Sequence, residues 1–290
     1  MLTMSLLTKE KQMKLFKFQA IAALMIASTM SYGEVVGYKD WKDYVLDPLL
    51  TLDGRKITTV KEWETIRRPE ILKQFVEKVC GKMPEPGTYT NTFKVVRNEL
   101  IRNGTVRAKT ARLTITGPNG SKNFDVPMWL PVSNKPVPVI MLCNHSTNPD
   151  HGNGDKVYGS ITDDNFNNPY LPVPMILSRG YGVVVYNMNM FAPTPSPTSK
   201  WEDELYSLFN LTTTDTWRYW GVWAFGGMRV IDYLVTDPDI DISRIATIGH
   251  SRSGCASQWI GVLDQRVSLC INNEGPTGGA SLWAYEGLQG

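Results

Sequence analysis

The sequence predicts an α/β fold, a three-layer sandwich in which helices cover both faces of a mostly parallel central sheet. Three observations predict it. Strand-like stretches separated by turn signals open the sheet, and two continuous apolar runs typical of buried parallel strands follow. A further strand then ends in a turn that presents Ser251 and leads into a helix. With 290 residues, 42% of them apolar, the chain can form one large domain with a core.

The first strands are expected at 93–101, 105–115 and 123–130. The segments Arg102-Asn-Gly104 and Gly117-Pro-Asn-Gly120 separate them and are typical of tight turns. These three stretches therefore predict an antiparallel start to the sheet.

The apolar runs at 137–143 and 182–186 predict parallel strands that are covered on both faces. Upstream of all the strands, residues 68–79 predict a short helix that ends near Gly81.

A long helix is predicted at 214–234, before the strand that carries the serine. Its large side chains recur at spacings of three and four, and we expect its tryptophans to lie in the core rather than to contact a cofactor. Thr214 or Asp215 can cap its start, and Asp237-Pro238 ends it. The periodic residues are Trp217, Trp220, Ala224, Met228, Ile231 and Leu234.

The N-terminal stretch is typical of a secretory signal peptide. Lysines precede an apolar run at 18–30, which is too short to favour a membrane span, and the small residues after it suit a signal peptidase. We expect a signal peptide within 1–33, starting at Met13, then an N-terminal extension at 34–90 packed on a catalytic domain at 91–290. Secretion or export to the periplasm follows from this assignment.

Charge and cysteine content limit the partners. Residues 1–33 hold four Lys and one Glu, so their removal leaves 26 basic and 27 acidic residues and no basic cluster for nucleic acid. No second long apolar run is present, so we expect no stable membrane association, and we expect a monomer. The sequence contains no Cys-x-x-Cys pair, so we expect no zinc site. Cys143 and Cys270 lie in apolar runs, where a buried thiol is the usual outcome.

Ser251 is the candidate nucleophile. It stands between an apolar strand and small residues that begin a helix, where backbone N–H groups and the helix dipole favour a negative charge. Arg252 follows it and could donate to the same oxyanion. A serine, Ser253, stands where the common elbow has its second glycine. The alternative is that Ser251 only caps the helix.

Glu274 is the candidate acid of a catalytic triad. It follows the next strand, and adjacent strand ends lie close together in a doubly wound sheet. A carboxylate there could orient a histidine and stabilise its imidazolium. A helix-capping or surface acid is the equal alternative from the residues alone.

Together, Gly249–Gly254, Glu274 and Gly278-Gly279 resemble the glucuronoyl esterase family, carbohydrate esterase family 15. The resemblance implies an α/β-hydrolase fold without metal or cofactor. It implies cleavage of the ester that joins the (4-O-methyl-)glucuronic acid of xylan to lignin alcohols. It also makes Ser251 the nucleophile, Arg252 the oxyanion donor and Glu274 the triad acid, and it suggests that Trp283 contacts the sugar.

Two departures from the family pattern stand out. Many members have a uronate-binding lysine where this chain has Cys255. The family histidine lies well beyond the acid, whereas His145, His151 and His250 all precede Ser251. We expect His250 to point away from the nucleophile and His145 to contact the substrate or line the oxyanion loop. The simplest interpretation is a sequence truncated at its C-terminus, lacking its last strands and catalytic histidine, and therefore catalytically impaired.

Other functions remain open at this point. An acetylxylan esterase or another carbohydrate esterase could use the same elbow. A non-catalytic carbohydrate-binding relative would agree with the missing base and the abundant Trp and Tyr. A peptidase is a weaker alternative, since nothing indicates a peptide-binding domain.

Overall fold

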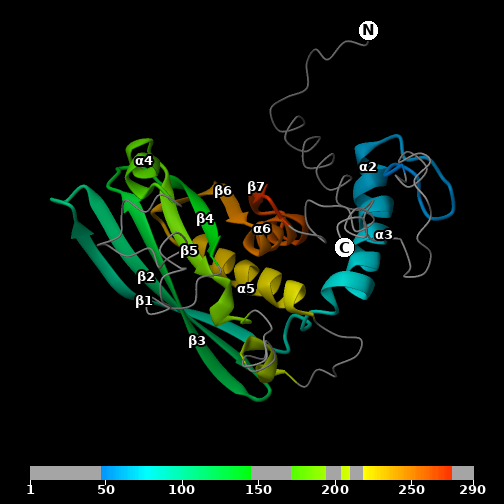
Figure 1. The fold of residues 1–290 in the computed structure, drawn as a ribbon, viewed down its shortest axis with the longest axis horizontal. Coiled ribbons are helices and arrows are strands. Elements are labelled where there is room, and N and C mark those ends of the chain that lie inside the picture. Colours follow the sequence, from blue (N-terminus) through cyan, green and yellow to red (C-terminus); the bar gives the residue numbers. More distant parts are fainter. Residues whose placement is uncertain (1–46, 145–170, 194–203, 210–217, 276–290) are drawn as a thin grey trace, which may run out of the picture. The chain divides into compact units, whose positions relative to one another are not determined.

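The computed structural model describes residues 47–144, 171–193, 204–209 and 218–275 (Figure 1). The chain divides into two compact units. One is Cys80–Gly275, and the other is Met1–Val79 with Pro276–Gly290. Several predictions fall outside the described residues: the signal peptide, His145, His151, Trp283, and the helix caps Thr214 and Asp215.

Residues 60–80 form one continuous helical stretch. It consists of α2 (Val60–Glu62), the π-helix η2 (Trp63–Arg67), α3 (Arg68–Phe75) and the π-helix η3 (Val76–Cys80). The predicted start at 68 was wrong, because Thr59 and Glu62 form a capping box that begins the helix eight residues earlier. Its buried side chains include Trp63, Ile71 and Phe75.

The unit Cys80–Gly275 is built on one seven-stranded sheet of order β1-β2-β3-β5-β4-β6-β7. The first three strands pair antiparallel, β3 pairs antiparallel with β5, and β5, β4, β6 and β7 pair parallel. The predicted antiparallel start and the buried parallel strands are therefore confirmed. The strands are β1 (Thr90–Ile101), β2 (Val106–Gly117), β3 (Gly120–Pro131), β4 (Val137–Asn144), β5 (Gly182–Asn187), β6 (Ile240–His250) and β7 (Val267–Asn273).

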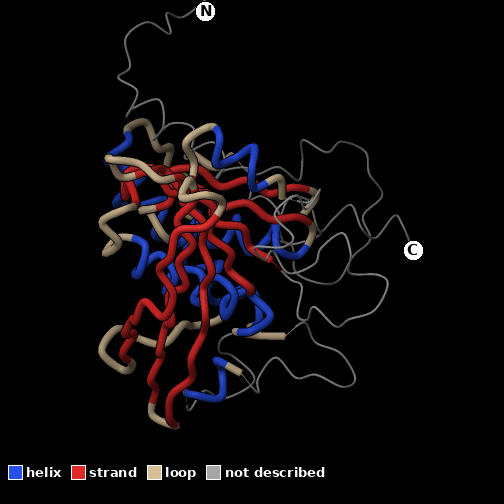
Figure 2. The backbone as a smooth tube through the Cα atoms, turned by 90° about the vertical axis from the view of Figure 1, so that its left-hand side faces the viewer, coloured by secondary structure: helices blue, strands red, loops and turns tan. Residues whose placement is uncertain are grey.

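Helices lie on both faces of this sheet, as β5 shows by its alternation. Val183 and Val185 belong to the core cluster that includes Val173 and Leu177 of α4 (Val173–Ser178). On the opposite face, the Tyr186 ring packs against α5 (Tyr219–Leu234), where a side chain at Gly226 would overlap its hydroxyl. The expected α/β fold is confirmed; Figure 2 distinguishes its strands and helices by colour.

One longer helix and two 3-10 helices complete the described elements. The helix α6 (Arg252–Leu263) follows β6, and the 3-10 helices η4 (Met188–Met190) and η6 (Leu205–Leu208) follow β5. None of the helices in the described ranges is long and apolar enough to cross a membrane.

The helix α5 begins at Tyr219, and Arg218 at its N-cap has extended backbone. The predicted helix at 214–234 therefore does not include Arg218. Trp220 and Trp223 are buried, as predicted. The indole of Trp223 donates to the Ala192 carbonyl at 2.6 Å, and its own carbonyl accepts from the Tyr186 hydroxyl at 2.7 Å. These bonds fix α5 against the segment that follows β5.

None of the four cysteines is in a disulfide. Cys143 is buried as predicted, and burial raises the pKa of its thiol. Cys270 is only half-buried, contrary to the prediction, because β7 is the edge strand of the described sheet.

Candidate active site

Ser251 occupies a strained turn between β6 and α6. Its backbone angles are φ 54° and ψ −126°, in a region that residues with a side chain rarely adopt. Its N–H donates to the carbonyl of Asn273 at the end of β7, at 2.9 Å. Such backbone costs about 1–3 kcal/mol and persists only where the surroundings enforce it, which occurs often at functional sites.

Two glycines allow the turn to close. A side chain at Gly249 would overlap the Ser253 carbonyl, and one at Gly254 would overlap the side-chain oxygen of Asn272. Because neither position can hold even a methyl group without displacement, the first turn of α6 packs directly against the ends of β6 and β7.

The serine at the place of the second elbow glycine is accommodated by a hydrogen bond. Ser253 is fully buried, and its hydroxyl donates to the His250 carbonyl at 2.9 Å. Further along α6, the Ser257 hydroxyl lies 3.0 Å from the Thr247 hydroxyl, and both residues are fully buried. The start of α6 is therefore hydrogen-bonded to the sheet directly behind Ser251.

The hydroxyl of Ser251 is not used as a helix cap. No side-chain capping bond forms at the start of α6, and no described residue is hydrogen-bonded to this hydroxyl. The alternative that Ser251 only caps the helix is therefore wrong. The hydroxyl instead lies at a helix N-terminus, whose unsatisfied N–H groups suit an oxyanion.

Arg252 is half-buried beside Ser251, and its guanidinium forms no ion pair with any residue in the described ranges. It lies near Tyr219 at the start of α5. Burial raises the pKa of the Tyr219 phenol, the nearby Cys255 adds to this rise, and the charge of Arg252 opposes it. The charge of Arg252 therefore lies close to the start of α5.

Glu274 directly follows β7, as predicted, and β7 pairs in parallel with β6. Its backbone is also left-handed, at φ 52°, and its side chain is 79% exposed. Its Oε2 lies 3.1 Å from Nε2 of His250. The structure thus places Ser251, Arg252 and Glu274 at two neighbouring strand ends, with His250 between them.

Sequence reasoning missed two neighbours of the site. The sequence predicted only that the His250 side chain points away from the nucleophile. It did not predict the contact between His250 and Glu274. Nothing in the sequence pattern marks Tyr219 as a neighbour of Arg252. Cys255, at the position of the family lysine, is fully buried in the first turn of α6, so its thiol packs in the core and faces no solvent.

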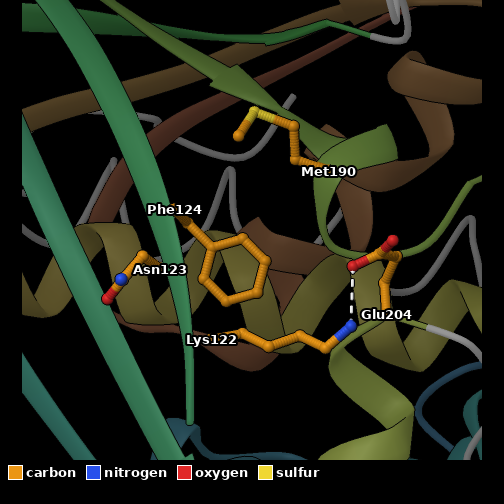
Figure 3. A pocket seen from close by; sticks show the side chains of 5 residues that line it. All are labelled: Lys122, Asn123, Phe124, Met190 and Glu204. Carbon is orange, nitrogen blue, oxygen red and sulfur yellow. Dashed lines mark hydrogen bonds and ion pairs between the residues drawn. The ribbon is translucent and has the colours of Figure 1, made fainter.

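A pocket of about 380 Å³ lies elsewhere, at the start of β3 and beside η4 (Figure 3). An ion pair of 2.9 Å between Lys122 and Glu204 forms part of its wall, and Met190 lies on its other side. Its described lining does not include Ser251, Arg252 or Glu274, so it is separate from the predicted nucleophile and acid.

Comparisons with known proteins agree with this geometry. A family profile described as "Glucuronyl esterase, fungi" matches residues 113–289, more than half of the chain. The chain is 29% identical to carbohydrate esterase MZ0003 from an unknown prokaryotic organism, over 81% of this chain and 59% of that protein. It is 27% identical to 4-O-methyl-glucuronoyl methylesterase 1 of Wolfiporia cocos, over 89% of this chain and 55% of that protein.

Solved structures give the same result. The chain resembles a glucuronoyl esterase from Solibacter usitatus with a TM-score of 0.67 and 29% identity, over 82% of this chain and 65% of that one. A promiscuous CE15 esterase from a marine bacterial metagenome matches with a TM-score of 0.62 and 28% identity, over 80% and 64%. The chain spans a little over half the length of the curated relatives it matches. By the family profile, this chain belongs to the glucuronoyl esterase family, carbohydrate esterase family 15.

Proposed function

We propose that the protein is a serine esterase that cleaves esters of 4-O-methyl-glucuronic acid. The observation that carries the proposal is the strained turn that presents the Ser251 hydroxyl, which no described residue bonds, at the N-terminus of α6 beside Arg252 and Glu274. The substrate class comes from the relatives, one of which is named a 4-O-methyl-glucuronoyl methylesterase. The finer expectation is an ester between xylan-borne glucuronic acid and a lignin alcohol.

The proposed reaction is acyl transfer. The Ser251 oxygen attacks the ester carbonyl carbon while a histidine takes its proton, and backbone N–H groups of α6 and the Arg252 guanidinium hold the oxyanion. The carbon–oxygen bond to the alcohol then breaks, and the alcohol leaves with the proton from the histidine. Water attacks the acyl-enzyme in the same way, releasing the uronic acid and restoring Ser251.

Glu274 is the proposed acid that orients the histidine. The family resemblance places that histidine after Glu274, and the sequence contains no histidine after Ser251. His145 and Trp283 stay proposed substrate contacts, since both lie outside the described residues. No step in this reaction calls for a metal or cofactor.

The setting of the enzyme is proposed from the sequence. Residues 1–33 would direct secretion or export to the periplasm, residues 34–90 would form the extension, and residues 91–290 would form the catalytic domain. We expect a monomer that acts on glucuronoxylan or lignin–carbohydrate esters, without nucleic acid or stable membrane association.

A second candidate is an acetylxylan esterase or another carbohydrate esterase. The observation that favours it is the presence of Cys255 in place of the family lysine, which leaves no cation at the position where the family resemblance implies uronate recognition. The same elbow would then attack an acetyl ester.

The test uses the protein expressed from its complete coding sequence, with methyl 4-O-methyl-glucuronate and acetylated xylan as substrates. Ser251→Ala should lower kcat/KM at least about 10³-fold, because the nucleophile is removed. Ser243→Ala changes an exposed serine on the same strand and should leave kcat/KM unchanged.

The outcomes separate the candidates. Faster turnover of the acetyl ester would transfer the assignment to the second candidate. Xylan binding without turnover, equal in wild type and Ser251→Ala, would establish the non-catalytic carbohydrate-binding alternative.

A further inference from the structure

We propose that His250 is a positioning residue that holds the carboxylate of Glu274 in the orientation needed for catalysis. The inference rests on the proposed function, in which Glu274 orients the histidine base. His250 would fix one carboxylate oxygen of Glu274 and leave the other for that base.

Two contacts link the ends of β6 and β7 in addition to their parallel pairing. The backbone N–H of Ser251 donates to the Asn273 carbonyl at 2.9 Å, which fixes the main chain on either side of the two candidate catalytic residues. The side chains of the flanking residues form the second link, with Nε2 of His250 3.1 Å from Oε2 of Glu274. Because an ionised carboxylate can only accept hydrogen bonds, Nε2 of His250 must carry the proton.

Glu274 needs such a partner. Its side chain is 79% exposed, and among the described residues His250 is the only one that bonds to its carboxylate. An exposed glutamate without a partner samples several rotamers, and ordering it costs up to about 1.5–2 kcal/mol. The His250 side chain is only 23% exposed, and its main chain is fixed because its carbonyl accepts from the buried Ser253 hydroxyl.

The geometry does not favour His250 as the base itself. No hydrogen bond joins the Ser251 hydroxyl to His250 or to any other described residue, and Nε2 of His250 is occupied by Glu274. The two roles differ in what they require of the side chain. A positioning role needs only an N–H donor at the place of Nε2, whereas a base must accept and return a proton.

The first measurement compares His250→Ala with His250→Gln in the protein from its complete coding sequence. The amide N–H of glutamine can replace the Nε2 donor but cannot shuttle a proton. His250→Ala should lower kcat about tenfold at unchanged KM, the scale at which partners behind a reacting group usually act. His250→Gln should recover most of that loss. Equal, large losses in both variants would show proton transfer by His250, and an unchanged kcat in His250→Ala would show that Glu274 needs no such partner; either result overturns the proposal.

The second measurement does not depend on turnover. A hydrogen-bonded imidazole N–H exchanges slowly enough to give a downfield proton resonance. We expect one from His250 in wild type, which persists in Glu274→Gln, because the amide oxygen still accepts, and vanishes in Glu274→Ala. Absence of this resonance in wild type, or its survival in Glu274→Ala, would overturn the proposal whether or not the protein is an esterase. Presence of the predicted resonance in a protein without turnover would refute the proposed function and leave the contact established.

Discussion

Two regions of the molecule hold non-glycine residues in left-handed backbone, and they hold them for different reasons. In the β1–β2 hairpin, Arg102 and Asn103 have φ of 51° and 55° in an exposed turn, and a side chain at Gly104 would meet only open space. At the ends of β6 and β7, Ser251 and Glu274 have φ of 54° and 52°. The turn at Ser251 is enforced by the close approach at Gly249 and Gly254 and by its N–H bond to the Asn273 carbonyl, and the exposed Glu274 side chain is hydrogen-bonded to His250. Left-handed backbone alone therefore does not identify a functional site; left-handed backbone that several contacts enforce does.

The two regions also bury polar groups differently. The strand β2 carries Lys109, whose ammonium lies 2.7 Å and 2.9 Å from the two oxygens of Asp237, with both side chains buried. Behind Ser251, by contrast, the buried polar pair is neutral, formed by the hydroxyls of Thr247 and Ser257. A buried ion pair thus links β2 to the connection between α5 and β6, whereas the buried pair behind Ser251 is formed by hydroxyl groups.

The largest expected difference comes from removing the buried ammonium. Lys109→Met should lower the free energy of unfolding by about 3–5 kcal/mol, because it leaves the Asp237 carboxylate buried without its cation. Arg112→Met is the matched control on the same strand. Arg112 forms a two-fold hydrogen-bonded pair with Asp125, but both side chains are exposed, so we expect a loss of at most about 1 kcal/mol. Denaturant titration of both variants measures the difference, and similar losses would contradict the comparison.

The same ion pair should make the antiparallel half sensitive to acid. Burial acts to raise the pKa of Asp237, but hydrogen bonds from Lys109 and Tyr233 outweigh it, so that the pKa lies below its usual value. A lowered native pKa contributes stability that is present above the unfolded value, near about 3.9, and is lost as the pH falls through the native pKa. The difference in unfolding free energy between wild type and Lys109→Met should therefore shrink below about pH 4. If the difference in unfolding free energy stays constant down to pH 2, ionisation of Asp237 is not the cause of that difference.

A smaller effect distinguishes two glycines. Gly249→Ala should lower the free energy of unfolding by about 2–3 kcal/mol, because the methyl group overlaps the Ser253 carbonyl and displaces α6. Gly104→Ala places the same methyl group in open space at φ 79°, and only the backbone strain of about 1 kcal/mol remains. Thermal unfolding measures both, and only Gly249→Ala should also lower esterase kcat. Equal losses of unfolding free energy in the two variants would mean that packing constrains the turn at Ser251 no more than it constrains the hairpin.

The same contrast explains how far the sequence could predict the structure. Strand runs and turn signals located the sheet, the pairing of β6 with β7, and the positions of Ser251 and Glu274, because those patterns are local. The contact between His250 and Glu274 depends on two side chains that only the register of neighbouring strands brings together. The early start of the helical stretch at Val60 had a local signal, the Thr59–Glu62 capping box, which the prediction of a helix at 68–79 did not use.

The smallest effect tests the neutral pair behind the nucleophile. Ser257→Ala should lower the free energy of unfolding by about 1 kcal/mol, because one buried hydrogen bond is lost while the Thr247 hydroxyl still donates to the Ser257 carbonyl at 3.1 Å. The double variant Ser257→Ala with Thr247→Val should be more stable than the sum of the two single losses predicts, because the bond between the two hydroxyls is lost only once in the double variant. Ser268→Ala is the control, since that hydroxyl donates to the Ser243 carbonyl at 2.7 Å in an exposed position. Strictly additive losses in a double-mutant cycle would contradict the pairing, whereas recovery of stability without recovery of kcat would show that these hydroxyls also fix the position of α6 beneath Ser251.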